Sequence, residues 1–164
     1  MSKKFLGVAL SMAVVATMSV GTVVFAEEAE VSYSEEALGG KWGCSVPNAT
    51  NSFYATCVAG VEDTVAELDA EASVIVTDAS GDSQKQLDQV ADLISQGVKA
   101  IVLIPIDSNA IIPAVEEAAE AGIPVFVMDT PCGETDGVVA TVIADNYNAG
   151  EIAGRALLEG IGGE

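Results

Sequence analysis

The chain has 164 residues, of which 25 are acidic, 6 are basic and none is histidine, and its formal net charge is −19. So acidic a surface repels phosphate backbones, which excludes nucleic acid as an expected partner, and the missing histidine excludes histidine-based triads and imidazole metal ligands. Half of the residues are hydrophobic, which excludes an acidic disordered tail, and the length suits one domain with a buried core.

The chain begins with the pattern of a secretory signal peptide over residues 1–26. Lys3 and Lys4 precede a long apolar run, and Val24 and Ala26 place small or modest side chains three positions and one position before the expected cleavage point. We expect cleavage after Ala26 and export to the periplasm or the exterior of the cell envelope. The alternative is an uncleaved membrane anchor, since the apolar run is long enough to span a bilayer.

The segment that follows, residues 27–40, is acidic, lacks an apolar period and ends in two glycines. This composition predicts a flexible leader, so we expect the folded domain to begin at Lys41. Removal of residues 1–26 would take away two basic side chains and no acidic one, which changes the net charge to −21. The exported chain should therefore favour neutral or cationic partners.

Beyond the leader, apolar runs typical of buried strands alternate with segments of helical spacing. In chain order they predict a strand over 42–46, a helix over 52–69, a strand over 73–77, a helix from Ser83 to the stop at Gly97, a strand over 100–104, a helix over 109–121, strands over 124–128 and 138–144, and a helix over 148–158. This alternation predicts an α/β fold, a doubly wound parallel sheet with right-handed crossovers. Ligands bind such sheets beyond the carboxyl ends of the strands.

Two of these helices indicate which face they bury. In the first, the apolar residues at helical spacing are Tyr54, Cys57, Val58, Val61, Val65 and Leu68. In the second, they are Leu87, Val90, Ala91 and Ile94. We expect both faces to pack on the sheet.

The loops after the strands carry none of the motifs of nucleotide-binding or nucleophilic enzymes. The sequence has no GxGxxG, no GxxxxGK[ST] and no GxSxG. The three cysteines have no histidine to pair with, which excludes a cysteine–histidine nucleophile and a standard zinc site. We therefore predict a protein that is not an enzyme and that uses no cofactor and no metal ion.

Aspartates nevertheless follow several strands, where a carboxylate can hold a ligand or a metal, or act as acid and base. For Asp78 and Asp107 we favour caps of helices or turns. Asp129 ends a buried strand before Thr130 and Pro131 and is no obvious helix cap, so for it we favour a ligand role. Metal-dependent hydrolysis by strand-end aspartates remains an alternative, and it would require metal-dependent turnover by the purified protein.

Three stretches together resemble periplasmic sugar-binding proteins of the ribose- and galactose-binding type. They read GCSVPNATNSFYATCVAGVEDTVAEL, QLDQVADLISQGVKAIVLIPIDSNAIIPAVEEAAEAGIPVFVMDT and VVATVIADNYNAGEIAGRALLE, and they span about Lys41 to Glu159 in the order and spacing of that family. The resemblance implies the type I periplasmic binding protein fold, in which two Rossmann-like lobes joined by a hinge close on a small polar ligand. Regulators of the lactose-repressor type share this core, but they carry a helix-turn-helix where this chain has its predicted signal peptide.

The resemblance also implies ligand contacts at five positions. Asn51, Phe53 and Tyr54 match the family's first loop, whose asparagine or aspartate bonds sugar hydroxyls and whose aromatic face stacks on the sugar ring. Asp129 matches an aspartate that accepts from two hydroxyls, whereas Thr130 stands where the ribose type has arginine, so the sugar itself stays open. From the residues alone, Asn51 fits a helix cap equally well, Tyr54 falls on the buried stripe and Phe53 falls off it.

Ala144, Asp145 and Asn146 match the family's first hinge crossing. The resemblance thus divides the chain into an amino-terminal ligand-binding lobe over 41–146 and the first helix of a second lobe over 147–164. Because the family needs a further lobe, we expect an amino-terminal fragment or a truncated gene product, in which the single lobe binds sugar weakly.

The cysteines fit an oxidising, exported setting. Cys44 lies on the predicted first strand and Cys57 on the buried face of the helix that follows it, so the two either form a disulfide or remain separate small core residues. Cys132 lies in the loop after Asp129, close to the expected ligand, and a reactive role is its less favoured interpretation.

On these grounds we predict an extracytoplasmic solute-binding protein that holds a monosaccharide or a similar small polyol for an ABC-type importer. Its protein partner would be the membrane permease, and the complete protein would be a monomer. The alternative is a sugar or signal-molecule receptor of the same fold that feeds a membrane sensor kinase or chemoreceptor. Neighbouring permease and ATPase genes would favour the importer, and a neighbouring kinase or chemoreceptor gene would favour the receptor.

Overall fold

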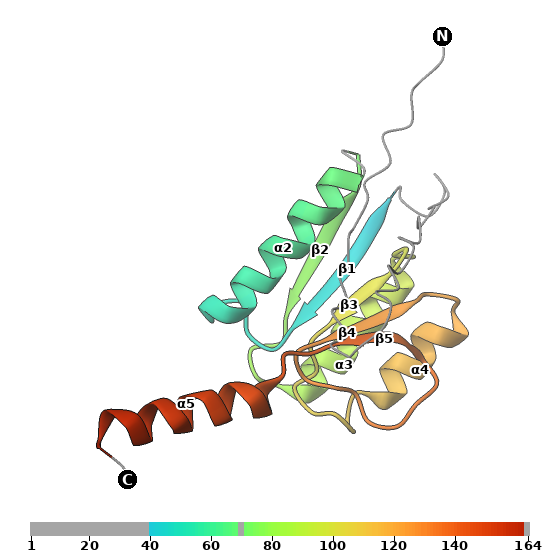
Figure 1. Ribbon diagram of the computed structural model, residues 1–164. Helices are drawn as coiled ribbons and strands as arrows, with labels where there is room; N and C mark the ends of the chain where they lie inside the picture. Colours follow the sequence, from blue (N-terminus) through green and yellow to red (C-terminus); the bar gives the residue numbers. More distant parts are fainter. Residues whose placement is uncertain (1–39, 69–70, 163–164) are drawn as a thin grey trace, which may run out of the picture. The chain divides into compact units, whose positions relative to one another are not determined.

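The computed structural model describes residues 40–68 and 71–162 (Figure 1). The signal peptide predicted over residues 1–26 and the leader as far as residue 39 lie outside the described residues. Within the two described ranges, no helix is both long enough and apolar enough to cross a membrane.

Strands and helices alternate along the described chain. Their bounds are β1 (Lys41–Val46), α2 (Ser52–Leu68), β2 (Ser73–Asp78), α3 (Ser83–Ser95), β3 (Ile101–Leu103), α4 (Ile112–Glu120), β4 (Val125–Met128), β5 (Val138–Val142) and α5 (Asn146–Gly160). Every predicted element is present, and most ends differ from the prediction by one or two residues.

The start of α4 differs most from the sequence prediction, since the helix begins at Ile112 and not at Asn109. The Asp107 carboxylate accepts hydrogen bonds from the backbone N–H groups of Asn109 and Ala110, both at 2.8 Å, and forms a turn before the helix. Pro113 lies in the first turn of α4, where its missing N–H costs no helical hydrogen bond.

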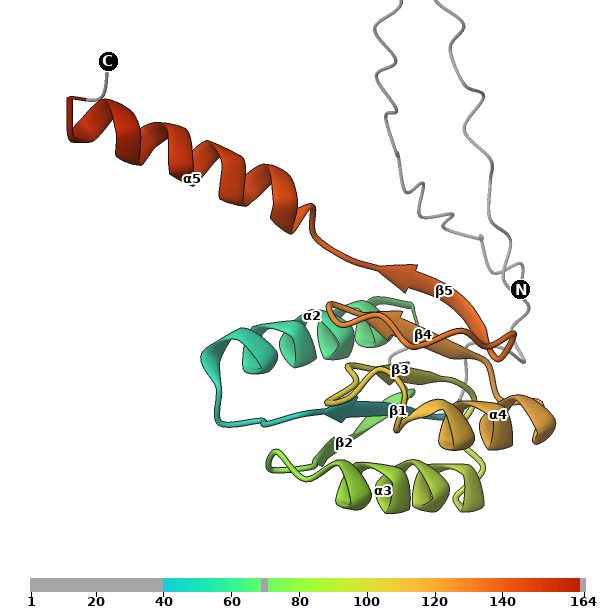
Figure 2. The same cartoon turned by 90° about the horizontal axis from the view of Figure 1, so that it is seen from below.

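All five strands of the sheet are parallel, in the order β2-β1-β3-β4-β5. The chain runs from β1 outward to β2 and then returns to the other side of β1, so the strand order reverses between β1 and β3. With right-handed crossovers, this reversal places α2 on one face of the sheet and α3 and α4 on the other (Figure 1, Figure 2). The predicted doubly wound α/β fold is confirmed.

The core has one part on each face of the sheet. The larger part joins α3 and α4 to β3 and β4, and its fully buried side chains include Leu93, Ile101, Leu103 and Val115. The smaller part joins α2 to β1 around Cys44 and Val46.

The buried face of α3 includes the predicted Leu87, Val90 and Ile94 and extends to Gln86 and Leu93. The fully buried residues are Gln86, Val90 and Leu93, whereas Leu87 and Ile94 are only half-buried. The prediction that Leu87, Val90 and Ile94 face the core is therefore confirmed, and Gln86 is a buried position that a search for apolar residues passes over.

Two apolar regions stay uncovered in the described chain. On its face of the sheet, helix α2 covers β1 and β2. The side chains of Phe126 on β4 and Val142 on β5 are left exposed. Helix α5 has no buried residue. Local side-chain interactions stabilise this helix. The Asp145 carboxylate accepts a hydrogen bond from the Asn148 N–H at 2.9 Å, and Arg155 forms an ion pair with Glu151.

Candidate functional site

The carboxyl ends of the strands bring several polar loops to one edge of the sheet. Because all strands are parallel, the segments after β1, β3 and β4 leave the sheet at this edge. The N–H of Gly81 donates to the Pro47 carbonyl at 2.8 Å, which ties the loops after β2 and β1 together. The N–H of Gly133 donates to the Ser108 carbonyl at 2.7 Å, which ties the loops after β4 and β3 together.

Asn51 caps α2. Its side-chain oxygen accepts from the Phe53 N–H at 2.9 Å, which satisfies one of the free donors in the first turn of the helix. The preceding turn is fixed by Asn48, whose side-chain oxygen accepts from the N–H of Thr50 at 2.9 Å and from its hydroxyl at 2.7 Å. The cap interpretation of Asn51 is confirmed, and its contact with a sugar stays a prediction.

Replacing Asn51 by alanine should lower the free energy of unfolding by about 1 kcal/mol, because the Phe53 N–H loses its acceptor. Asn51→Ser keeps a capping oxygen and should retain the parent's stability. Urea denaturation of the three proteins measures the difference. Equal midpoints for the alanine and serine variants would contradict the cap.

The two aromatic residues of α2 have different surroundings. Tyr54 packs against the core between α2 and β1, which confirms the interpretation of Tyr54 as a core residue. Phe53 is 51% exposed, and its ring meets the Tyr54 ring edge-on, with centroids 5.3 Å apart and an angle of 76° between the planes. Tyr54 thus holds the Phe53 ring in place while much of that ring remains available to a partner.

Asp129 closes β4 in an unusual backbone conformation. Its φ is +65°, in the left-handed region that residues other than glycine rarely adopt. Its N–H donates to the Val142 carbonyl of β5 at 2.9 Å, and the next N–H, of Thr130, donates to the Met128 carbonyl at 2.8 Å. Strain of this kind collects at functional sites, where neighbouring hydrogen bonds hold the residue against its preference.

The carboxylate of Asp129 is half-buried and keeps most of its acceptor capacity. The Thr130 hydroxyl donates to Oδ2 over a long 3.4 Å. Burial and, after it, the charge of Asp129 raise the pKa of the Cys57 thiol on α2. Met128, the residue before Asp129, packs against the same core cluster as Tyr54 and Cys57 of α2, so the end of β4 contributes to the α2 side of the sheet.

The other strand-end aspartates are engaged in turns. Asp78 accepts from the Ser80 N–H at 2.7 Å. The pKa of Asp107 is lowered by the backbone N–H groups of Ala110 and Asn109 that it accepts from. The turn interpretation is confirmed for both, and within residues 40–68 and 71–162 no three histidine, cysteine or acidic side chains gather as a possible metal site.

All three cysteines are free thiols. Of the two predicted alternatives for Cys44 and Cys57, the disulfide is not formed and the pair are separate core residues. Cys44 is fully buried on β1, and Cys57 packs half-buried against the same cluster from α2. Cys132 is also half-buried, and burial followed by the charge of Glu116 raises the pKa of its thiol, although the Gly133 N–H acts the other way. A raised pKa disfavours the reactive thiolate.

Cys44 should make stability depend on pH in the alkaline range. Burial, with smaller effects of Glu62 and Cys57, raises the pKa of the Cys44 thiol from 9.0 to about 11. The pKa of this thiol is higher in the folded state than in the unfolded state. The contribution of the protonated Cys44 thiol to the free energy of unfolding is therefore complete below pH 9 and is lost as the pH rises toward 11. Over this pH range the free energy of unfolding of the parent should therefore fall by about 2–3 kcal/mol more than that of Cys44→Ala.

Urea unfolding of both proteins at the two ends of that pH range measures this difference. Any cavity left by the substitution costs the same at each pH and cancels. Equal alkaline losses in the two proteins would contradict the assignment.

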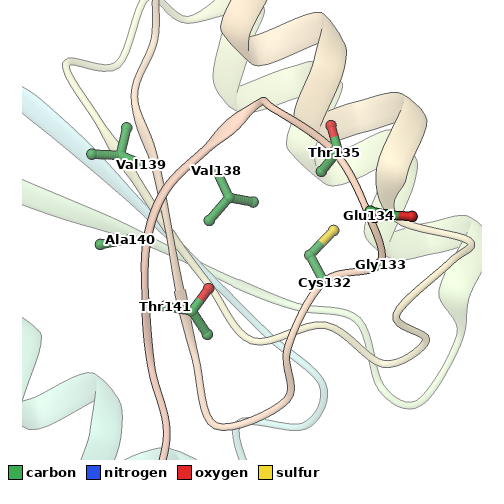
Figure 3. Close-up of a pocket in the computed structure, with 8 residues that line it drawn as sticks. All are labelled: Cys132, Gly133, Glu134, Thr135, Val138, Val139, Ala140 and Thr141. Atoms are coloured by element: carbon green, nitrogen blue, oxygen red, sulfur yellow. The ribbon is translucent and has the colours of Figure 1, made fainter.

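A separate hollow of about 570 Å³ lies beside β5. Figure 3 shows its lining residues, which come from the β4–β5 connection and from β5 itself: Cys132, Gly133, Glu134, Thr135, Val138, Val139, Ala140 and Thr141. None of the five predicted ligand contacts lines it. The hollow is open to solvent, unlike the enclosed sites that bury most of a small ligand. We therefore place the candidate site at the strand-end edge.

The residues predicted as a hinge form the link between β5 and α5. Ala144 follows the strand, Asp145 caps the helix, and Asn146 is its first residue. The N–H of Asn146 donates to the Ala144 carbonyl at 2.9 Å. The predicted domain boundary after residue 146 therefore falls one residue inside α5.

The sequence of this chain matches a known family. Residues 42–164 match the family model described as the periplasmic binding protein domain. The chain belongs to this family. The neighbours of this periplasmic binding protein domain in sequence and in structure are consistent with that assignment.

Among curated relatives, the domain is 38% identical over 121 residues to the ribose import binding protein of Bacillus subtilis. The matched region covers 73% of this chain and 38% of that protein. It is 32% identical over 116 residues to a D-apiose import binding protein of Paraburkholderia graminis, covering 71% of this chain and 36% of the relative. The chain thus spans little more than a third of the length of these relatives.

Solved structures show the same fold. An ABC transporter solute-binding protein from Clostridium phytofermentans with bound β-D-glucose is 25% identical, with a TM-score of 0.68, over 74% of this chain and 37% of that one. A solute-binding protein from Agrobacterium vitis with bound D-fucose is 27% identical, with a TM-score of 0.66, over 75% and 43%. The domain therefore has the architecture of one lobe of a type I periplasmic binding protein.

Proposed function

We propose that this domain binds a monosaccharide or a similar small polyol as part of an exported solute-binding protein that serves an ABC-type importer. The observation that carries the proposal is Asp129, a half-buried carboxylate held in a left-handed conformation at the end of β4. Relatives named for ribose, apiose and other sugars support the ligand class.

The chemistry of the edge suits a neutral ligand rich in hydroxyl groups. The Asp129 carboxylate accepts from hydroxyls, and charge-assisted hydrogen bonds of this kind are stronger than neutral ones. The exposed Phe53 ring offers an apolar face to the C–H groups of a sugar ring. Asn51 and Thr130 add short polar groups. Because Thr130 is shorter than the arginine of the ribose type, it leaves room for a ligand beside Asp129.

The proposal assigns each part of the chain a place in such a protein. Residues 1–26 direct export and are removed, residues 27–40 form a leader, and residues 41–146 form the ligand-binding lobe. Ala144, Asp145 and Asn146 act as a hinge, and α5 packs within a second lobe, which is supported by its lack of buried residues here. The assembled protein is a monomer that holds its ligand without transforming it and delivers it to a membrane permease.

Saturation-transfer NMR on the purified chain tests the ligand class. D-ribose, D-glucose and myo-inositol should give transfer signals, with dissociation constants on the order of millimolar since one lobe covers only part of a ligand. L-leucine and L-glutamate serve as controls of similar size and should give none. Signals from the amino acids, or none from any sugar, would overturn the proposal.

A further inference from the structure

Helix α3 contributes a buried glutamine to the core. Gln86 is only 1% exposed, although the face around it is apolar. Its Nε2 donates to the Ile104 carbonyl at 2.8 Å and, more weakly, to the Ser45 hydroxyl at 3.4 Å, and its Oε1 accepts from the Ile106 N–H at 2.9 Å. One side chain thus fixes the backbone on both sides of Pro105, where β3 leaves the sheet.

The segment that Gln86 fixes supports the loop after β4. Three residues beyond Pro105, the Ser108 carbonyl accepts from the Gly133 N–H at 2.7 Å and from the Cys132 thiol at 3.7 Å. The approach is close, because a Cβ atom at Gly133 would lie 2.6 Å from the Asn109 side-chain oxygen and 3.1 Å from the Ser108 carbonyl oxygen. The loop that starts at Asp129 therefore rests on the loop that Gln86 fixes.

We propose that Gln86 is a positioning residue for the sugar site. It acts through Ser108 and Gly133 on the placement of Asp129, and it does not contact the sugar, since it is buried beneath the edge. This inference rests on the proposed function.

The physical reason is that strand-end loops lack the ladder hydrogen bonds of the sheet. If Gln86 is removed, the Ile104 carbonyl and the Ile106 N–H lose their partners, and an unpaired polar group away from water is unfavourable. The segment must move to find new partners. Gly133 packs so closely on Ser108 and Asn109 that it must move with them. The displacement should therefore reach the carboxylate of Asp129.

The test compares Gln86→Met with a matched variant on the same helix. Methionine keeps the length of glutamine and removes its hydrogen bonds. Gln89 also donates to a strand-end carbonyl, that of Asp78 at 3.0 Å, but this carbonyl ends β2, on the far side of β1 from β3 and β4. Gln89→Met is thus a control that removes a side-chain hydrogen bond of the same helix on the side of the sheet away from the Ser108–Gly133 contact.

The amide chemical shifts of Ser108, Gly133 and Asp129 are read in ¹⁵N–¹H spectra of each variant, with and without D-ribose. In Gln86→Met we expect all three amides to shift in the free protein and ribose affinity to fall about tenfold, the effect of one well-placed hydrogen bond to a charged group. Gln89→Met should leave these amides and the affinity unchanged. Gly133→Ala, which disturbs the same contact from its other end, should reproduce the Gln86→Met result and substitutes for it if that variant does not fold.

Unchanged amides in Gln86→Met, or equal effects in Gln89→Met, would overturn the positioning role. A parent chain whose spectrum responds to none of D-ribose, D-glucose and myo-inositol would overturn the proposed function, and the sugar role of Gln86 with it. The amide shifts of the free proteins distinguish the two failures, because they do not depend on any ligand.

Discussion

Leu93→Ala should lower the free energy of unfolding by about 2–5 kcal/mol, the largest stability effect we expect from one side chain in this fold. Leu93 is fully buried on α3, and it packs directly on the backbone of β1. A Cβ atom at Gly43 would lie 2.8 Å from the Leu93 Cδ1 atom, so no space separates the helix from the strand. Removal of the side chain leaves a cavity in the larger part of the core.

The control for Leu93→Ala is the same substitution on an exposed helix. Leu157 of α5 is 63% exposed, and Leu157→Ala should change stability by less than about 0.5 kcal/mol. Chemical denaturation measures both. Losses of similar size at the two positions would contradict the packing of α3 on the sheet.

A double-mutant cycle tests the contact between Leu93 and Gly43 itself. Gly43→Ala alone should destabilise by about 1–3 kcal/mol, because the added methyl group meets Leu93. In the Leu93→Ala background the same methyl group enters space that the leucine has left. The double variant should therefore lose less stability than the sum of the single variants, whereas additive losses would contradict the contact.

Asp129→Ala should weaken sugar binding by about 1–3 kcal/mol, which is about five- to 150-fold in affinity, the cost of removing a partly buried hydrogen-bond partner. Alanine is also unfavourable at a φ of +65°, so Asp129→Asn is the sharper variant. Asparagine tolerates the left-handed conformation and removes the charge alone. Its affinity should fall while its stability stays near that of the parent.

The control for Asp129 lies in the same connection between β4 and β5. Asp136 is exposed, and Asp136→Asn makes the same change of charge without touching the strand end. Its ribose affinity, measured by NMR titration, should equal that of the parent. If Asp129→Asn and Asp136→Asn bind ribose as tightly as the parent, Asp129 is not a sugar ligand.

Much of the fold could be predicted because strongly apolar strands and glycine-terminated helices leave few alternatives. Strand β3 is buried or half-buried along its length, as its continuous apolar run indicates, whereas β4 buries Val125 and Val127 and leaves Phe126 exposed. Asp78 and Asp107 could be assigned to turns because aspartate bonds backbone N–H groups two or three residues ahead.

The site was harder to predict because its geometry depends on backbone conformation and on distant contacts. No pattern in the sequence predicts the positive φ of Asp129 or the hydrogen bond from the Gly133 N–H to the Ser108 carbonyl. Gln86 could not be predicted as a buried residue, because a lone polar residue in an amphipathic helix ordinarily faces water and only the end of β3 gives it buried partners. The free Cys44 and Cys57 thiols show the same limit, since spacing cannot set the distance between two sulfurs.

The most direct test of the account is a ¹⁵N–¹H titration of the purified chain with D-ribose, mapped by residue. We predict saturable shifts at the strand-end edge, at the amides of Asn51, Phe53, Asp129 and Thr130. The amides of Val139 and Thr141, in the hollow beside β5, should not move. Shifts confined to that hollow, or no shifts with D-ribose and none in the same titration with D-glucose and myo-inositol, would contradict a sugar site at the carboxyl edge of the sheet.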